Sequence, residues 1–136
     1  MAKPTDMRVA AAELFFLPVE TRVPLKFGPE TLTHVTCARA RLTVRLANGD
    51  TAIGWGETPL SVQWVWPSAL PYEPRHQALK GFCIRLTKAW AAFDALSHPL
   101  ELGHDFQQNE LPKLLDKFNA ESHAGEPMPW LAALVC

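Results

Sequence analysis

Two cations and an aromatic residue stand close together in the segment from Pro18 to Glu30. Arg22, Lys26 and Phe27 lie in this segment, which proline and glycine interrupt and which we therefore expect to be a loop. A cation suits a carboxylate ligand, and a phenyl ring beside it would supply an apolar wall. The alternative is that both cations are ordinary surface charges.

A second proline-rich segment, Pro59 to Pro74, carries two tryptophans. Trp64 and Trp66 are two positions apart, so in an extended segment both indoles face the same side. Aromatic rings on a stiffened loop offer a large contact area at small entropic cost, which suits a lid over a ligand. The alternative is that they pack on other parts of the protein, and we expect one indole to be structural and the other to face a pocket.

The other reactive residues form no catalytic or metal-binding pattern. Cys37, Cys83 and Cys136 are far apart, which predicts neither a disulfide framework nor a zinc ribbon. Cys83 falls on an apolar helix face, where a thiol behaves as a small hydrophobe. His98 and His104 lack the four-residue spacing of a helical metal-binding pair. The sequence therefore predicts no catalytic residue and no metal ligand in this chain.

The composition is that of an ordinary globular domain. Of the 136 residues, 48% are hydrophobic and 20% are charged, which argues against disorder. The net charge of −1 provides no strong field to attract nucleic acid or an anionic membrane. No apolar stretch approaches the roughly 20 residues that span a bilayer, and the first residues do not resemble a signal peptide. We therefore expect a cytoplasmic protein without nucleic-acid or membrane partners.

Three predicted strands come first among the elements that must position these residues. The apolar run over residues 9–17 predicts the first strand. Over residues 36–46, apolar and polar side chains alternate with period two, as in a half-exposed strand. Residues 51–57 then return after Asn48-Gly49, which we interpret as a two-residue hairpin turn. That turn predicts the pairs Ala47 with Asp50, Val44 with Ile53, and Leu42 with Trp55.

Helices follow the second proline-rich segment. Apolar residues at three- and four-residue steps predict an amphipathic helix that ends at His98-Pro99. Its inward side chains are Leu79, Phe82, Cys83, Leu86, Trp90 and Phe93. A second helix is predicted over about residues 105–120, with Asn109 as a candidate cap because Pro112 suits only a first turn. Strands followed by helices predict an α+β fold, a three-stranded antiparallel meander followed by a helical bundle.

Several features occur in a characteristic order. A proline-containing segment (residues 21–33) leads through Phe-Gly into an alternating strand, an Asn-Gly turn and the ending Gly-Trp-Gly-Glu at residues 54–57. A helical segment and a proline-led apolar helix start at Pro129 follow. Over residues 7–136 this order resembles the N-terminal capping domain of the enolase superfamily, in particular the mandelate racemase and muconate-lactonizing enzyme group.

The resemblance implies one part of a two-part enzyme. In that family the capping domain supplies two loops that close over the substrate, so the candidate substrate-binding residues here are Arg22, Lys26, Phe27, Trp64 and Trp66. A modified TIM barrel supplies carboxylates that hold Mg²⁺ and a Lys or His base that removes a proton next to a substrate carboxylate. The reactions implied are those of an isomerase or lyase: racemization, cycloisomerization or dehydration.

A catalytic barrel needs about 250 residues, whereas only ten residues follow Glu126 in this chain. In this respect the chain departs from the family. We therefore expect residues 1–6 to be a loose tail, residues 7–125 the capping domain, and residues 126–136 the start of a barrel that is otherwise absent. Such a fragment is expected to be inactive alone. Its implied partners are the missing barrel, a small carboxylate substrate and a second copy in a homo-oligomer. The alternative is an autonomous α+β interaction domain that docks through residues 130–136.

Overall fold

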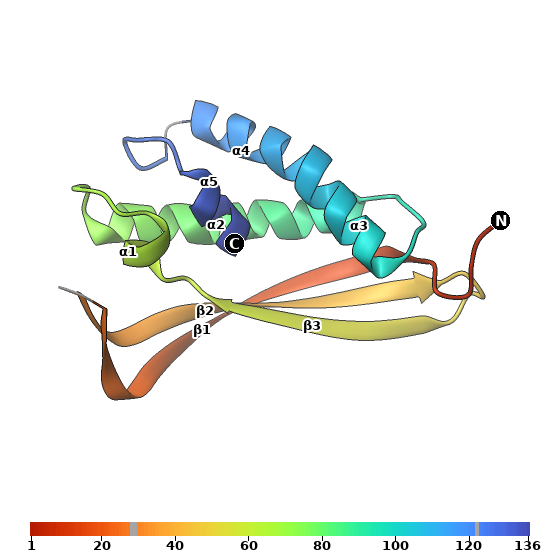
Figure 1. The fold of residues 1–136 in the computed structure, drawn as a ribbon, viewed down its shortest axis with the longest axis horizontal. Coiled ribbons are helices and arrows are strands. Elements are labelled where there is room, and N and C mark those ends of the chain that lie inside the picture. The colour runs from red at the N-terminus through yellow and green to blue at the C-terminus, as the bar shows by residue number, and fades with distance from the viewer. Residues whose placement is uncertain (28–29, 122) are drawn as a thin grey trace.

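A computed structural model describes residues 1–27, 30–121 and 123–136. Three antiparallel strands in the order β1-β2-β3 precede the helices, so the predicted α+β meander is confirmed. Figure 1 shows the described helices together on one face of the sheet. None of them combines the length and the apolarity needed to cross a membrane. The elements are β1 (Met7–Phe27), β2 (Glu30–Leu46), β3 (Thr51–Pro59), α1 (Val62–Val65), α2 (Tyr72–Ala92), α3 (Pro99–Asp105), the π-helix η1 (Phe106–Glu110), α4 (Leu111–Ala120) and α5 (Trp130–Val135).

β1 and β2 form a much longer hairpin than the sequence predicted, and the expected loop over residues 18–30 is wrong. Strand pairing continues to the pair Phe27 and Glu30. Pro18 is tolerated because β1 is an edge strand, where a residue without an N–H need not interrupt the ladder. The pairing shifts register between residues 20 and 25, so the second proline of this segment is absorbed as an irregularity within the hairpin.

The turn between β2 and β3 has three residues rather than the predicted two. The Leu46 amide donates to the Asp50 carbonyl at 2.8 Å, and the Gly49 amide donates to the Leu46 carbonyl at 2.9 Å. Gly49 has a φ of 93°, as expected for the left-handed last residue of a three-residue hairpin loop.

The longer turn changes the register of β3 by one residue. Ile53 pairs with Thr43 and Trp55 with Arg41, so the predicted pairs with Val44 and Leu42 are wrong. A shift of one residue moves each side chain to the opposite face of the sheet. Ile53 and Trp55 consequently lie away from the helices, where they are 53% and 61% exposed.

α2 begins at Tyr72, before the apolar periodicity becomes visible. The predicted inward residues Leu79, Phe82, Cys83 and Leu86 are buried, and Trp90 and Phe93 pack against them. The helix ends at Ala92, earlier than the predicted stop at His98-Pro99. Instead, Pro99 begins α3, because the N–H that proline lacks is not needed in the first turn of a helix. The His98 ring nitrogen accepts a hydrogen bond from the Leu100 amide.

The helix predicted over residues 105–120 belongs to a longer helical run, α3–η1–α4. Pro112 lies in the first turn of α4, and the turns before it widen into the π-helix η1. This widening is expected where proline cannot donate the regular helical hydrogen bond. Asn109 lies inside η1 and does not cap α4, so the predicted cap is wrong.

The hydrophobic core lies between the sheet and the helices that cover one of its faces, the two layers seen in Figure 1. Aromatic rings join its parts: Phe82 meets Phe118 edge to face at 5.2 Å, and Trp90 stacks on Phe106 at 4.0 Å. α5 begins directly after Pro129, as predicted, and places two alanines in this core. The core therefore links the sheet, α2, α4 and α5 into one packed unit.

Candidate functional site

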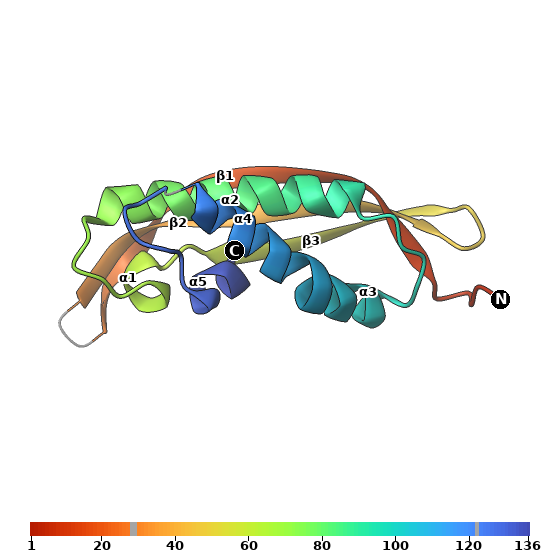
Figure 2. The same ribbon diagram turned by 90° about the horizontal axis from the view of Figure 1, so that it is seen from above.

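Both proline-rich segments lie at the same end of the molecule. Figures 1 and 2 both show α1 at the end where the β1–β2 hairpin reaches its turn. The two segments singled out from the sequence as candidate ligand-binding regions therefore lie at the same end of the fold.

The structure places Arg22 and Lys26 on β1, within the hairpin rather than on a loop. Both side chains are exposed. The side chain of Phe27 lies outside the part of the chain that the structure describes. The Thr21 hydroxyl donates to the carbonyls of Thr33 at 3.2 Å and Leu32 at 3.4 Å, which ties the two strands together at the level of these cations.

The two tryptophans of the second segment face opposite surroundings. Trp64 lies in the short helix α1 and is 68% exposed, whereas Trp66 follows that helix and is only 3% exposed. Helical geometry rotates successive residues by about 100°, so residues two apart point to nearly opposite sides. The prediction that both indoles face the same side is therefore wrong, because the segment is a helical turn and not an extended strand.

Trp66 fastens this segment to the rest of the protein. Its indole nitrogen donates to the Glu126 carboxylate at 2.8 Å, and its carbonyl accepts from the buried Arg75 guanidinium. The Arg75 Nε also donates to the Pro71 carbonyl at 3.3 Å. Arg75 belongs to α2, so this buried cation holds both ends of the loop between α1 and α2 against that helix. The exposed Trp64 therefore lies on a segment that is fixed to the rest of the protein.

His76 joins the start of α2 to the β1–β2 hairpin. Its Nε2 lies 3.0 Å from the Thr36 hydroxyl, and its Nδ1 lies 3.8 Å from the Glu73 carboxylate. Tyr72 stacks on the imidazole with ring centroids 5.4 Å apart. Burial lowers the pKa of His76 and outweighs the opposite effect of Glu73. The imidazole is therefore neutral near pH 7 and serves this junction as a hydrogen-bonding group.

A cavity of about 310 Å³ lies between the hairpin and the start of α2. His34 and Glu20 line it, with 4.0 Å between the imidazole Nε2 and a carboxylate oxygen. Tyr72 also lines the cavity, and burial, followed by the nearby Glu73 carboxylate, raises the pKa of its phenol. The remaining lining residues are Pro18, Val19, Val35 and Thr36. The cavity combines an apolar surface with a few hydrogen-bonding groups, as small-molecule sites do.

The sequence analysis missed the residues at this junction. Tyr72 and His76 are four residues apart, a spacing that places side chains together on one helix face and could have drawn attention to them. Thr36 meets His76 from 40 positions away. No local pattern indicates such a contact, because it depends on how α2 crosses the sheet.

Glu57 closes the Gly-Trp-Gly-Glu ending of β3. Its carboxylate accepts from the Arg39 Nε at 2.5 Å across the β2–β3 pair. Both side chains are partly exposed, and the pair joins β2 to β3.

Within residues 1–27, 30–121 and 123–136, no three His, Cys, Asp or Glu side chains are grouped closely enough to hold a metal ion. Of the residues predicted from the sequence, Arg22, Lys26, Trp64 and Trp66 do not belong to the wall of the cavity between the hairpin and α2. Comparisons with protein-family models, with curated proteins and with solved structures find no match to this chain.

Proposed function

We propose that this chain is the capping domain of an enolase-superfamily enzyme of the mandelate racemase and muconate-lactonizing group. Such an isomerase or lyase uses Mg²⁺ and removes a proton next to a substrate carboxylate. One observation carries the proposal: the two segments that would close over a substrate are distant in sequence but lie at the same end of the fold (Figures 1 and 2).

The hairpin supports the proposal by presenting cations on a braced element. Arg22 and Lys26 are exposed near its turn, where either could bind a carboxylate by a charge-assisted hydrogen bond. The contact between His76 and Thr36 holds the hairpin to α2 at 3.0 Å. A cation on a fixed support loses less entropy on binding than one on a free loop, which favours orientation of the substrate.

The second segment supplies an aromatic surface. Trp64 is exposed and is held in place through Trp66 and Arg75. We assign Trp64 the role of an apolar wall that excludes water from the substrate, and Trp66 a structural role. The assignment keeps one indole structural and gives the other to the substrate, and it stays a prediction.

The reaction chemistry is assigned to the barrel and not to this chain. Under this proposal, Mg²⁺ and the base would be held by barrel residues. Bound there, the metal stabilises the negative charge that forms on the substrate when the proton leaves. The residues of this chain contribute binding, orientation and exclusion of water.

α5 presents an apolar surface that suits a covering partner. Trp130, Leu131 and Leu134 are exposed on this short helix, while Ala132 and Ala133 are buried. Exposed apolar side chains grouped in this way mark interaction surfaces. Under the capping proposal the barrel covers them. The same observation favours the second candidate, an autonomous interaction domain that docks a protein partner through α5.

The reading frame beyond codon 136 tests the proposal first. We expect it to continue into strands that end in Asp and Glu, and we expect the longer protein to exchange the α-proton of a carboxylate with deuterium when Mg²⁺ is present, as followed by proton NMR. Arg22→Ala should raise KM about tenfold through loss of a charge-assisted hydrogen bond. Arg8→Ala is the matched control, because Arg8 is an exposed cation on the same strand that pairs with Asp94.

The isolated chain provides the second test. With α5 uncovered, the 136-residue protein should self-associate, and Leu134→Asp should reduce that association in sedimentation velocity. A stop codon after position 136, together with a monodisperse monomer that melts cooperatively, would contradict the capping proposal and favour the interaction domain.

A further inference from the structure

Two of the three cysteines, separated by 53 positions, meet in the fold. Cys83 lies in the middle of α2 and Cys136 follows α5. The Cys83 sulfur is 3.9 Å from the Cys136 carbonyl oxygen, and the Cys136 sulfur is 3.6 Å from the Leu79 carbonyl oxygen. All three cysteines are free thiols in this structure.

Helix geometry brings the two sulfurs over the same turn. Leu79 precedes Cys83 by one turn of α2, and helical side chains lean toward the N-terminus of their helix. The Cys83 sulfur therefore lies above the turn whose carbonyl the Cys136 thiol contacts. The remaining cysteine, Cys37, is on β2, opposite Leu17 and Pro59.

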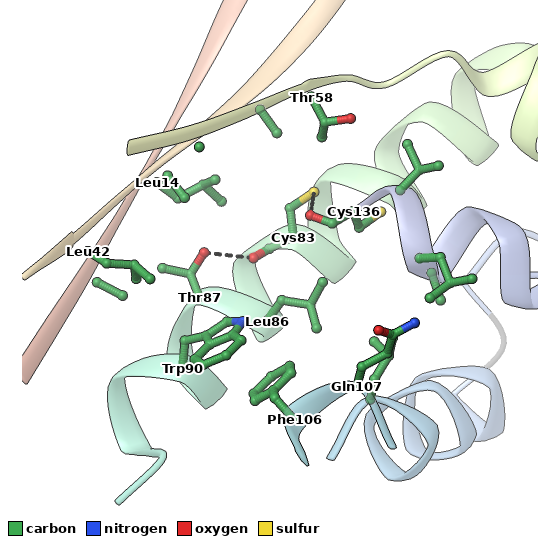
Figure 3. A pocket seen from close by; sticks show the side chains of 18 of the residues that line it. Leu14, Leu42, Thr58, Cys83, Leu86, Thr87, Trp90, Phe106, Gln107 and Cys136 are labelled. Atoms are coloured by element: carbon green, nitrogen blue, oxygen red, sulfur yellow. Dashed lines mark hydrogen bonds between the residues drawn. The ribbon is translucent and has the colours of Figure 1, made fainter. Parts of the chain in front are cut away.

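A cavity of about 430 Å³ gives access to both thiols. It lies between the covered face of the sheet and the helices, and both Cys83 and Cys136 belong to its wall (Figure 3). Cys37 does not line it. Most of the other lining side chains are apolar, so a small neutral oxidant can enter without breaking an ion pair.

From this juxtaposition we infer that Cys83 and Cys136 are a disulfide-forming pair, oxidised by a low-molecular-weight disulfide. The thiolate of Cys136, the more exposed of the two, attacks the small disulfide, forms a mixed disulfide and releases one small thiol. The Cys83 thiolate then attacks the Cys136 sulfur and releases the second small thiol. Two protein thiols are oxidised, one small disulfide is reduced to two thiols, and the new bond locks the residue after α5 onto α2.

The surroundings of the pair affect how fast this reaction proceeds at a given pH. The hydrogen bond with Cys83, followed by burial and repulsion from the Cys83 sulfur, holds the pKa of Cys136 well above its usual value. The thiolate is the attacking species in thiol–disulfide exchange, so a raised pKa makes the attack slower at neutral than at alkaline pH. Oxidation is therefore tested at pH 8.5.

Thiol counting and peptide mapping test the inference. The full 136-residue chain is treated with 2-hydroxyethyl disulfide, a small neutral disulfide, and then titrated with a thiol reagent in denaturant, where the count should fall from three thiols to one. Tryptic digestion should yield a linked pair of peptides, residues 81–85 and 118–136. The closed loop should raise the Tm of the oxidised protein by roughly 10 °C, reversibly with dithiothreitol.

Single cysteine variants provide the controls. Cys136→Ala changes a half-buried position and should keep two thiols after oxidation with no rise in Tm. Cys37→Ala is the matched control at the third cysteine, and it should still form the bridge and show the full rise. Three thiols remaining in the oxidised wild type, a bridge to the peptide 27–39, a covalent dimer, or a stable mixed disulfide with 2-mercaptoethanol would each overturn the inference.

Discussion

The two faces of the sheet carry aromatic residues from the same strands into opposite surroundings. On the covered face, Phe16 and Ala38 pack against the core beneath α2. On the open face, Phe15 lies beside Trp55 with ring centroids 6.1 Å apart. Figure 1 shows that the described helices lie only on the first of these faces. Neighbouring residues of one strand thus have very different environments.

On the open face, side chains interact through exposed ion pairs and a cation–π contact, and few of them are buried. Arg41 pairs with Glu13 at 2.7 Å and also lies over the Trp55 ring at 5.9 Å. Exposed ion pairs contribute only about 0–1 kcal/mol each, because water already solvates both charges. The difference teaches that the stability of this fold resides on the covered face, while the open face can vary with little cost.

The largest effect is expected from removing a ring on the covered side. Phe82→Ala should lower the free energy of unfolding by about 3–5 kcal/mol, because Phe82 is fully buried and the truncation leaves a cavity. Urea denaturation followed by circular dichroism measures this change. Phe15→Ala, the same substitution on the open face, should cost about 1 kcal/mol or less. Equal losses for the two variants would break the comparison.

A smaller effect is expected at the two tryptophans after β3. Trp66→Phe removes the buried indole hydrogen bond to Glu126 and should cost about 1–3 kcal/mol. Trp64→Phe changes an exposed side chain and should stay within about 0.5 kcal/mol. Thermal unfolding of the two variants gives the difference, and a larger loss for Trp64→Phe would contradict our assignment of Trp66 as the anchor.

On the open face, Arg41→Ala should cost about 1 kcal/mol or less, since it removes one exposed ion pair and one cation–π contact. The difference between wild type and variant should shrink further in 1 M salt, where exposed charges are screened. Urea denaturation at low and high salt measures both quantities. A loss comparable to that of Phe82→Ala would show that the open face is covered in solution.

The smallest effect is expected from the protonation of His76, the residue that joins α2 to the β1–β2 hairpin. Burial lowers the pKa of His76 below its ordinary value of 6.5, so below that value the unfolded chain binds the proton more readily than the folded protein. The free energy of unfolding should therefore fall as the pH drops below 6.5 and be unaffected by this group above it.

His76→Gln should reduce the fall in stability between pH 7 and pH 5, as measured by urea denaturation at each pH. The glutamine amide can still reach toward Thr36 but carries no titrating group. An unchanged pH dependence in the variant would show that His76 is not the group responsible.

Local periodicity predicted the secondary structure best where one face of an element is buried. The apolar residues of α2 recur at helical spacing and are buried, from Leu79 to Leu86. Between residues 18 and 30 the prolines led us to predict a loop where β1 and β2 pair. An edge strand tolerates a proline that a central strand would not. The candidate cations were therefore assigned to a loop when they lie on β1.

The candidate site was only partly predictable, because its parts come from segments that are distant in the sequence. The aromatic and charged residues drew attention to both segments, but the sequence did not indicate that the fold places them at the same end. Contacts such as His76 with Thr36 and Cys83 with Cys136 join positions 40 and 53 residues apart. No spacing rule reaches across such distances.

By itself, the sequence determined the order of strands and helices, the buried face of α2 and the start of α5 after Pro129. These features depend on interactions within a few residues, where periodicity and proline geometry act directly. Only the tertiary structure decided the register of β3, the separate surroundings of Trp64 and Trp66, and the proximity of Cys83 and Cys136. A single extra turn residue, or the crossing of one helix over a sheet, moves whole sets of side chains, and that choice is made by packing between distant segments.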